Sequence, residues 1–360
     1  MRIRLGLIPL LFLAACRGAT PDAATSLPPG QAPTSTAAAT STAPAPTSTT
    51  TTRETTTTAP PVVSGLEEFP VPAGSHPHDV APAGDGTVWY TAQRAGRLGR
   101  LDPASGRVEE VPLGAGSAPH GVIVGPDGAA WVTDGGLNAI VRVDHQTLEV
   151  EVFPLPGGEA NLNTAVFDGE RVLWFTGQAG IYGRLDPAAG EAEVFEAPGG
   201  RGPYGITATP AGEVFYASLA GSHIARIDTA TTTAQPIEPP TPAQGARRVW
   251  SDSQGRVWVS EWNAGQVGSY HPPTGQWREW RLPGEGPQPY AVYVDETDRV
   301  WLSDFGGADA LVRFDPTTET FEVFPLPTFD GAVRQLLGRP GEVWGAESAA
   351  DALVVARYGS

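Results

Sequence analysis

Seven side chains recur at one position of a repeated segment, and most of them are of types that act on ligands. Each stands eleven residues before a periodic aromatic residue, or ten in the last repeat. We call them the ring residues, because equivalent positions of a closed repeat form a ring: His78, His120, Asn163, Tyr204, Arg247, Tyr290 and Arg334. Histidine can act as a general base near neutral pH, and arginine binds anions. Two interpretations stay open: the set surrounds an anionic or polar ligand, or it joins neighbouring repeats to one another.

A second set of equivalent positions, three residues after each periodic aromatic residue, contains four carboxylates. They are Asp134, Glu261, Asp304 and Glu347. Carboxylate oxygens are preferred ligands of Mg²⁺ and Ca²⁺, so we predict these four as candidate metal ligands and Mg²⁺ as a possible cofactor. The alternative is that they form ion pairs with Arg247, Arg248 or Arg334 of other repeats.

Other catalytic patterns are missing from the sequence. It has no Gly-x-Ser-x-Gly elbow, no Walker loop and no His-Glu-x-x-His motif. The single cysteine, Cys16, lies near the N-terminus, so thiol chemistry in a folded domain is excluded.

The element that must position both sets is a repeat of nearly constant length. Its aromatic residues are separated by 42, 43, 41, 43, 43 and 43 positions, and they are Trp89, Trp131, Trp174, Phe215, Trp258, Trp301 and Trp344. A period of roughly 40 to 45 residues with short alternating strands is typical of a β-propeller, with one four-stranded sheet per repeat. The sequence therefore predicts an all-β, seven-bladed propeller whose innermost strands line a central channel.

The repeats also predict how the ring closes. Glycines at 86, 128, 212, 255 and 341 suit tight hairpin turns, because glycine accepts a positive φ at little cost. The first repeat opens with an outer-strand pattern at Glu67–Val71, and the last repeat ends at Ala352–Tyr358 without one. We expect the N-terminal strand to complete the last blade, which removes free sheet edges.

The N-terminal segment predicts export and a lipid anchor. Residues 1–15 place two arginines before a short apolar run, as a signal peptide does, and Leu13-Ala14-Ala15-Cys16 resembles a lipobox with Cys16 as the lipidated residue. Residues 16–64, rich in Thr, Ser, Pro and Ala, predict a disordered stalk, and residues 65–360 the propeller. We expect a membrane-anchored lipoprotein on the outer side of the cytoplasmic membrane.

The charge of the chain narrows the choice of partners. The formal net charge is -17, which argues against nucleic acid because phosphate contacts need basic surfaces. We expect a monomer that binds a small molecule or a cell-surface ligand and meets the membrane only through its lipid.

The repeated wording resembles one enzyme family over residues 66–358. It includes SHPHDV (Ser75–Val80), SAPHGV (Ser117–Val122), GPYGIT (Gly202–Thr207), WVSEWNAGQVG (Trp258–Gly268) and two EVFPLP segments, and it is similar to the virginiamycin B lyase, or streptogramin lyase, family. The resemblance implies a seven-bladed propeller that opens streptogramin B antibiotics, and so confers antibiotic resistance, by Mg²⁺-assisted elimination. It also implies one histidine as base, a second that contacts substrate and two glutamates that hold the metal.

The family residues are incomplete at the directly equivalent blades. Arg334 stands in place of the base, Ala332 in place of the first metal glutamate, and Tyr290 in place of the substrate histidine, while Glu347 lies near the second glutamate.

Blades 1 and 2 match the family pattern better. His78 corresponds to the substrate contact and His120 to the base, and Asp134 lies one residue short of the second metal glutamate, although Ala118 replaces the first. The predicted function is a carbon–oxygen lyase acting on a cyclic ester. The alternatives are a non-catalytic ligand-binding propeller and a lactonase-like metal hydrolase.

Overall fold

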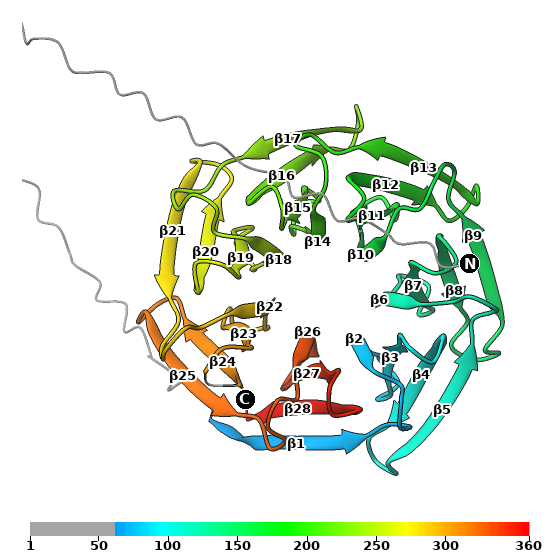
Figure 1. The fold of residues 1–360 in the computed structure, drawn as a ribbon, viewed down its shortest axis with the longest axis horizontal. Coiled ribbons are helices and arrows are strands. Elements are labelled where there is room, and N and C mark those ends of the chain that lie inside the picture. The colour runs from blue at the N-terminus through cyan, green and yellow to red at the C-terminus, as the bar shows by residue number, and fades with distance from the viewer. Residues whose placement is uncertain (1–61, 308, 360) are drawn as a thin grey trace, which may run out of the picture. The chain divides into compact units, whose positions relative to one another are not determined.

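The computed structural model describes residues 62–307 and 309–359, and every regular element within them is a β-strand. Seven four-stranded antiparallel sheets are arranged as blades around a central axis, in the order of the sequence (Figure 1). The predicted seven-bladed propeller is confirmed. The expected signal peptide, Cys16 and most of the expected stalk lie outside the described residues.

Each blade has four strands, numbered along the chain. The inner strands are β2 (Pro77–Pro82), β6 (Pro119–Val124), β10 (Leu162–Phe167), β14 (Pro203–Ala208), β18 (Ala246–Ser251), β22 (Pro289–Val294) and β26 (Val333–Arg339). The second strands are β3 (Val88–Ala92), β7 (Ala130–Asp134), β11 (Leu173–Gly177), β15 (Val214–Ser218), β19 (Val257–Glu261), β23 (Val300–Asp304) and β27 (Glu342–Glu347). The third strands are β4 (Arg97–Asp102), β8 (Ala139–Val143), β12 (Ile181–Asp186), β16 (His223–Asp228), β20 (Gln266–His271), β24 (Ala310–Asp315) and β28 (Ala352–Tyr358). The outer strands are β5 (Arg107–Pro112), β9 (Val150–Pro154), β13 (Glu191–Glu196), β17 (Thr233–Ile237), β21 (Gln276–Arg281), β25 (Thr320–Pro325) and β1 (Val63–Pro70).

The two ends of the propeller close it, as the sequence predicts. Strand β1 pairs antiparallel with β28, with Leu66 opposite Ala356 and Phe69 opposite Leu353, and becomes the outer strand of the last blade. In Figure 1 the blue strand β1 lies alongside the red strand β28. The N-terminal strand thereby covers an edge that would otherwise be open to pairing with another chain.

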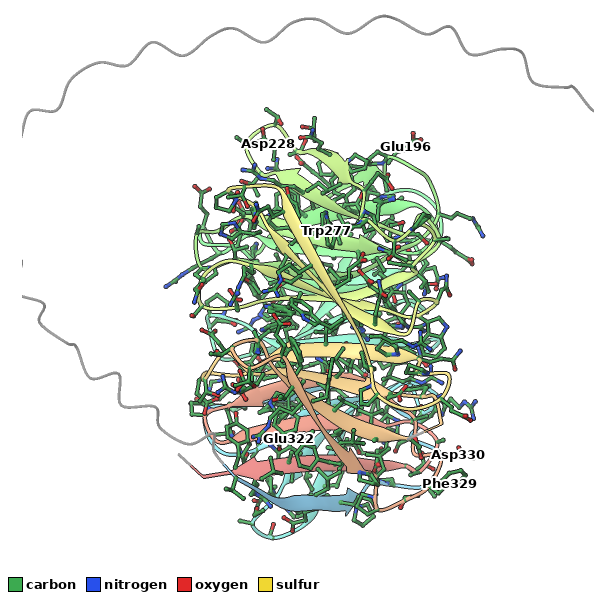
Figure 2. The ribbon with its side chains drawn as sticks, turned by 90° about the vertical axis from the view of Figure 1, so that its left-hand side faces the viewer. Glu196, Asp228, Trp277, Glu322, Phe329 and Asp330 are labelled. Atoms are coloured by element: carbon green, nitrogen blue, oxygen red, sulfur yellow. The ribbon has the colours of Figure 1, made fainter. Side chains whose placement is uncertain are left out.

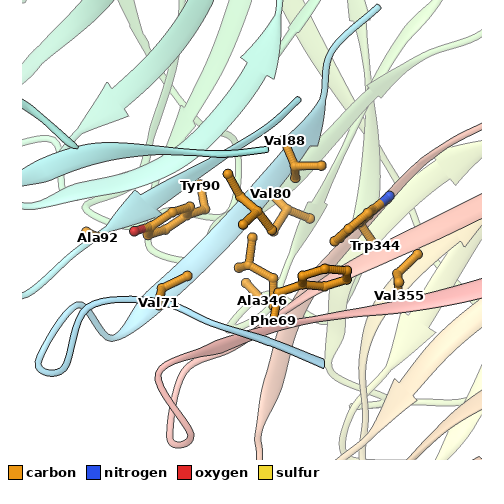
Figure 3. Packing of buried hydrophobic residues seen from close by; sticks show 11 residues of the cluster. Phe69, Val71, Val80, Val88, Tyr90, Ala92, Trp344, Ala346 and Val355 are labelled. Atoms are coloured by element: carbon orange, nitrogen blue, oxygen red, sulfur yellow. The ribbon is translucent and has the colours of Figure 1, made fainter. Parts of the chain in front are cut away.

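The periodic aromatic residues are the core of the contacts between blades. The six tryptophans of the period and Phe215 are at most 2% exposed. At the closure, Trp344 packs against Phe69 with ring centroids 5.4 Å apart, in a cluster that also holds Val80 and Tyr90 of the first blade (Figure 3). Burial of large aromatic side chains between blades thus fixes each blade against the next.

An aspartate before the second strand explains part of the repeat pattern in four blades. The indole N–H groups of Trp131, Trp174, Trp258 and Trp301 donate to Asp127, Asp168, Asp252 and Asp295, each in the hairpin turn before the tryptophan strand. The same aspartates accept hydrogen bonds from backbone N–H groups of their own turns. One side chain therefore holds the turn and satisfies a buried indole.

The predicted turn glycines adopt the expected backbone conformation. Gly86, Gly128, Gly212, Gly255 and Gly341 have φ values of 92°, 79°, 83°, 79° and 80°. In the side view, the loop between β25 and β26 carries Phe329, which is 80% exposed, and Asp330 at one margin of the propeller (Figure 2).

Candidate functional site

The seven ring residues sit at an irregularity that every inner strand shares. In each blade the pairing between inner and second strand shifts register just after the first inner residue, as between Pro77 and Val80 in β2 and between Pro289 and Val292 in β22. Such a bulge leaves a residue outside the regular ladder and turns its side chain in a new direction. The ring positions follow from this local backbone.

Hydroxyl groups from the second strands fasten these bulges to the next blade. The side chains of Thr91, Thr133, Thr176 and Ser260 donate to the backbone oxygens of His120, Asn163, Tyr204 and Tyr290 in the following blade. Thr133 also accepts from Gly121 N–H, and Ser260 from Arg248 N–H. These buried hydroxyls fix the positions of the ring residues along the channel axis. The sequence interpretation did not single them out.

His78 and His120 lie against each other at the start of β2 and β6. Their ring centroids are 3.7 Å apart, and the two residues are 4% and 8% exposed. His120 Nδ1 donates to the Asn163 backbone oxygen at 3.0 Å, and His78 Nδ1 donates to Asp79 Oδ1 at 2.8 Å. A carbonyl and a carboxylate accept only, so each Nδ1 carries the proton and each Nε2 keeps its lone pair.

Asp79 is the charge that organises this part of the ring. Its carboxylate accepts from Arg248 Nη2 at 2.8 Å and from Nη1 at 3.3 Å as well as from His78, and both Asp79 and Arg248 are buried. The pair joins the first blade to the fifth across the channel, over 169 positions of sequence. A bidentate arginine–carboxylate pair combines strong hydrogen bonds with fixed geometry.

Burial and charge keep the two imidazoles neutral. Burial lowers the pKa of His120 well below its ordinary value, and His78 and Arg248 act in the same direction against Asp79. Burial also lowers the pKa of His78 well below its ordinary value, aided by the positive charges of Arg248, Arg334 and Arg247. Burial raises the pKa of Asp79, and the neighbouring Arg248 opposes this. We call the end of the channel that carries the ring residues the channel mouth. At neutral pH it therefore offers two neutral imidazole bases close to positively charged arginines.

The opposite part of the ring is built from two tyrosines and two arginines. The hydroxyls of Tyr204 and Tyr290 are 2.5 Å apart, and Arg334 Nη1 donates to the Tyr290 hydroxyl at 3.4 Å. The guanidinium carbon of Arg247 lies 3.5 Å from the centroid of the Tyr290 ring and 4.8 Å from that of Trp262. Phe305 stacks on the other side of the cluster, 4.8 Å from Tyr290.

The pKa of Tyr290 moves in the opposite direction from that of its neighbour Tyr204. Burial by itself would raise it, but Arg247, Arg248, the hydrogen bond from Tyr204 and Arg334 together lower the pKa of Tyr290 below its ordinary value. Burial and the neighbouring Tyr290 instead raise the pKa of Tyr204. The positive field of the arginines thus acts on this hydroxyl directly.

The four predicted metal carboxylates do not meet one another. Asp134 accepts from the backbone N–H groups of Ala118, Gly136 and Leu137 and from the Ser117 hydroxyl, so its oxygens hold two loops in place. Asp304 accepts in the same way from Gln288 and Gly306.

Glu261 and Glu347 are buried with fewer donors, although Glu261 Oε2 accepts from Gln266 Nε2 at 2.6 Å. Glu261 Oε1 and both carboxylate oxygens of Glu347 have no hydrogen-bond partner in the described part of the chain. Burial raises the pKa of Glu261 to about 8. Burial and the nearby Glu68 and Asp309 raise the pKa of Glu347 to about 8. With no cation beside them, both carboxyl groups therefore favour the protonated form near pH 7.

One other group could bind a metal ion. Across residues 62–307 and 309–359, the cluster of three or more potential ligands is His78, Asp79 and His120, with ligand atoms within 4.8 Å of one another. Two imidazoles and one carboxylate suit a zinc-type ion better than Mg²⁺, which prefers oxygen ligands. Both oxygens of Asp79 also accept from Arg248. The residues present do not fit Mg²⁺, and we assign no chemical step to it.

Below the ring the channel is nearly filled. A cavity of about 30 Å³ is bounded by residues of all seven inner strands, among them Asp79, Arg248 and Gln335. A space of this size holds about one water molecule. The far end opens into an apolar pocket of about 430 Å³ lined by Ile123, Phe167 and Trp250 among others. A ligand that reaches the histidines must therefore enter from their own side.

The structure thus brings together His78 with His120, and Tyr204 with Arg247, Tyr290 and Arg334, but not Asp134, Glu261, Asp304 or Glu347. Sequence reasoning missed Asp79, and it considered Arg248 only as a partner for the second set of carboxylates. The signal was available: both residues directly follow a ring position, after His78 and Arg247.

Fold and site together define a seven-bladed propeller with a histidine, tyrosine and arginine ring at one mouth of its channel. The model of the virginiamycin B lyase family matches residues 48–314, and the chain belongs to that family. Among solved structures, it is similar to a streptogramin B lyase, with a TM-score of 0.75 and 24% identity over 82% of this chain and 97% of that one. It is also similar to virginiamycin B lyase from Staphylococcus aureus, with a TM-score of 0.75 and 20% identity over 81% of this chain and 98% of that one. A catalytically inactive variant of the Staphylococcus aureus enzyme with quinupristin gives the same values.

The search of curated proteins gave no match. In the described ranges there is also no helix with the length and apolar character needed to cross a membrane.

Proposed function

We propose that this protein is a carbon–oxygen lyase that opens a cyclic ester or a related small molecule by elimination. The observation that carries the proposal is the state of His120. Its Nδ1 proton is held by the Asn163 carbonyl, its Nε2 lone pair is available, and its lowered pKa keeps it neutral near pH 7. A fixed neutral imidazole at the mouth of a propeller channel is the arrangement that a general base requires.

The elimination that we propose balances without a further reagent. His120 Nε2 takes a proton from the carbon adjacent to the alkoxy carbon of the ester, where an attached carbonyl group makes the C–H acidic. The C–H electron pair becomes a carbon–carbon double bond to the alkoxy carbon. The neighbouring C–O bond breaks, and its oxygen leaves with the electron pair as a carboxylate. His78, 3.7 Å from His120 between ring centroids, contacts the substrate.

Negative charge that develops on the carbonyl oxygen needs a positive environment. Arg248, Arg334 and Arg247 each lower the pKa of His78, which shows that their field reaches the mouth. Preorganised positive groups stabilise such charge at no cost of rearrangement during the reaction. The proposed chemistry therefore uses the protein's own arginines, and we expect it to proceed without Mg²⁺.

Two other functions receive less support. A lactonase-like metal hydrolase needs converging carboxylates, and the four candidates are held apart or protonated. A binding propeller without catalysis is favoured by one observation, the low exposure of His78 and His120 at 4% and 8%. It would explain a mouth that holds a ligand and leaves it unchanged.

Product analysis distinguishes the three functions. The propeller is incubated with a streptogramin B and with simple lactones, with Mg²⁺ and then with EDTA, and the products are identified by mass spectrometry. An opened chain of unchanged mass with a new double bond supports elimination, and a product heavier by one water means hydrolysis. An unchanged ligand that nevertheless binds means a binding protein. His120→Ala should abolish the elimination, whereas His271→Ala, at the end of β20 beside Thr274, should leave it intact.

We also propose that the protein is exported and held at the outer side of the cytoplasmic membrane by lipid on Cys16, as a monomer. Support comes from the signal-like residues 1–15 and the lipobox-like segment before Cys16. Metabolic labelling with a radioactive fatty acid, with Cys16→Ala as control, tests the anchor: label retained on the variant would contradict it.

A further inference from the structure

Two arginines at the channel mouth have no acidic partner. In the described residues neither Arg247 nor Arg334 forms an ion pair, although neighbouring Arg248 is paired with Asp79. The chain as a whole has an excess of acidic groups, with 40 acidic and 23 basic residues and a net charge of -17. Both side chains are half-buried, so their charges are neither compensated by the protein nor fully solvated.

Both guanidinium groups are held in fixed positions around the same tyrosine. Arg334 donates through Nε to the Ser348 hydroxyl at 2.6 Å and through Nη1 to the Tyr290 hydroxyl at 3.4 Å. Arg247 lies 3.5 Å above the Tyr290 ring, and its Nε is buried without a hydrogen-bond partner in the described chain. The side chains are therefore already ordered, and a ligand would lose little affinity in arranging them.

The surroundings of the pair indicate the chemistry of its ligand. Guanidinium groups present planar forks of donors that match the planar oxygens of a carboxylate. Trp262 and Phe305, both half-buried, flank Tyr290 with ring centroids 5.7 Å and 4.8 Å from it. The site thus combines unsatisfied positive charge with an aromatic wall.

We propose that Arg247 and Arg334 bind a carboxylate group of the ligand. The substrate class of this protein then includes organic acids as well as neutral esters. The inference builds on the proposed function only in placing the ligand at the same mouth. His120 and the arginines act on different parts of that ligand, because Tyr204 stands between them in the ring, 5.8 Å from His120 and 4.9 Å from the Arg247 guanidinium.

Binding of small probes tests the site without any need for turnover. Benzoate is compared with benzamide, and galacturonate with galactose, by calorimetry and by tryptophan fluorescence, which Trp262 reports. Each acid should bind at least tenfold more tightly than its neutral counterpart, and the difference should shrink as salt rises. Equal affinity of acid and neutral probe would overturn the proposal.

Variants show whether the two arginines are responsible. Arg247→Gln and Arg334→Gln should each weaken benzoate binding at least tenfold, and Arg247→Lys, which keeps the charge and loses the planar fork, should restore only part of it. Arg281→Gln is the matched control, because Arg281 is exposed and its Nη1 donates to the Ala264 carbonyl. Unchanged benzoate affinity in both glutamine variants, with unchanged melting temperatures, would exclude the site.

A spectroscopic signature distinguishes recognition from a structural role. An anion bound between the arginines reduces the field on Tyr290, so benzoate should raise the pKa of one tyrosine, measured by phenolate absorbance, and Tyr290→Phe should remove that titration. Elimination of a cyclic ester by the wild-type protein, together with equal binding of benzoate by the wild type and by both glutamine variants, would keep the proposed function and reject this inference. Arginine-dependent acid binding without elimination would do the reverse.

Discussion

The two sides of the channel mouth treat charge in opposite ways. On the side of blades 1 and 2, Asp79 is bonded to both His78 and Arg248, and the imidazoles are neutral. On the side of blades 5 to 7, Arg247 and Arg334 have no carboxylate, and Glu347 is buried without a partner within the described chain. In our proposal the first side holds the ring together and orients the base His120, whereas the second side leaves the two half-buried arginines available for a ligand.

The largest expected effect comes from breaking the paired side. Arg248→Met would leave Asp79 buried beside His78 without its cation, and removal of one partner of a buried pair costs about 3–5 kcal/mol. Urea unfolding should show this loss. Arg184→Met, which removes the exposed pair with Glu193, should cost less than about 1 kcal/mol. Equal losses in the two variants would mean that the cross-channel pair is not structural.

A second prediction concerns the pH dependence of His120. Burial and the charges of His78 and Arg248 hold its pKa well below 6.5, so it stays deprotonated at and above that pH and gains a proton only in more acidic solution. The rate of elimination should be level between pH 6.5 and 8 and should fall only below this range. His120→Gln should reduce the rate about 10²- to 10⁴-fold, as loss of a general base does. A midpoint at or above 6.5 would contradict the buried environment of the base.

The unsatisfied acid on the other side predicts a loss of stability at alkaline pH. The pKa of Glu347 is about 8 in the folded protein against 4.5 as its ordinary value, so the folded state keeps a proton that the unfolded state releases. The contribution to stability is present below pH 4.5 and is lost as pH rises through about 8. Glu347→Gln should therefore raise the free energy of unfolding, relative to wild type, by on the order of 1–3 kcal/mol more at pH 9 than at pH 5.

Asp134→Asn is the matched control for that measurement. Asp134 accepts several hydrogen bonds as a carboxylate, so its replacement should destabilise the protein at both pH values. A Glu347→Gln effect of the same size at pH 5 and pH 9 would show that Glu347 is ionised throughout.

The smallest expected effect is that of magnesium. Because the carboxylates of the second set do not converge and Asp79 is held by Arg248, an excess of Mg²⁺ should leave the melting temperature where EDTA leaves it. Calorimetry of the wild-type protein checks this. A rise of several degrees with Mg²⁺, abolished by Glu347→Gln, would show that the acids rearrange around the ion.

Much of the fold could be predicted because its causes are local and repeated. The spacing of Trp89, Trp131 and their equivalents reflects one packing solution used in every blade, and turn glycines such as Gly86 follow from backbone sterics. The closing strand was predictable as well, since an unpaired outer pattern at one end of the chain matches a missing one at the other.

The site was predictable only in part. Alignment of the seven repeats places six candidate residues at one level along the channel axis, because equivalent residues of a propeller form rings. They are His78, His120, Tyr204, Arg247, Tyr290 and Arg334. It did not say which members would touch, since that depends on side-chain directions at seven bulges.

By itself, the sequence determined the seven-bladed architecture, its closure and the identity of the ring residues, because hydrophobic period and turn chemistry act over a few positions. The tertiary structure alone decided how the charges are shared. Asp79 bonds Arg248 across the channel, 169 positions away, and thereby leaves Arg247 and Arg334 without an acidic partner in the described residues. The reason is physical: a buried carboxylate is satisfied by the donor that three-dimensional packing brings nearest, and no spacing along the chain encodes that distance.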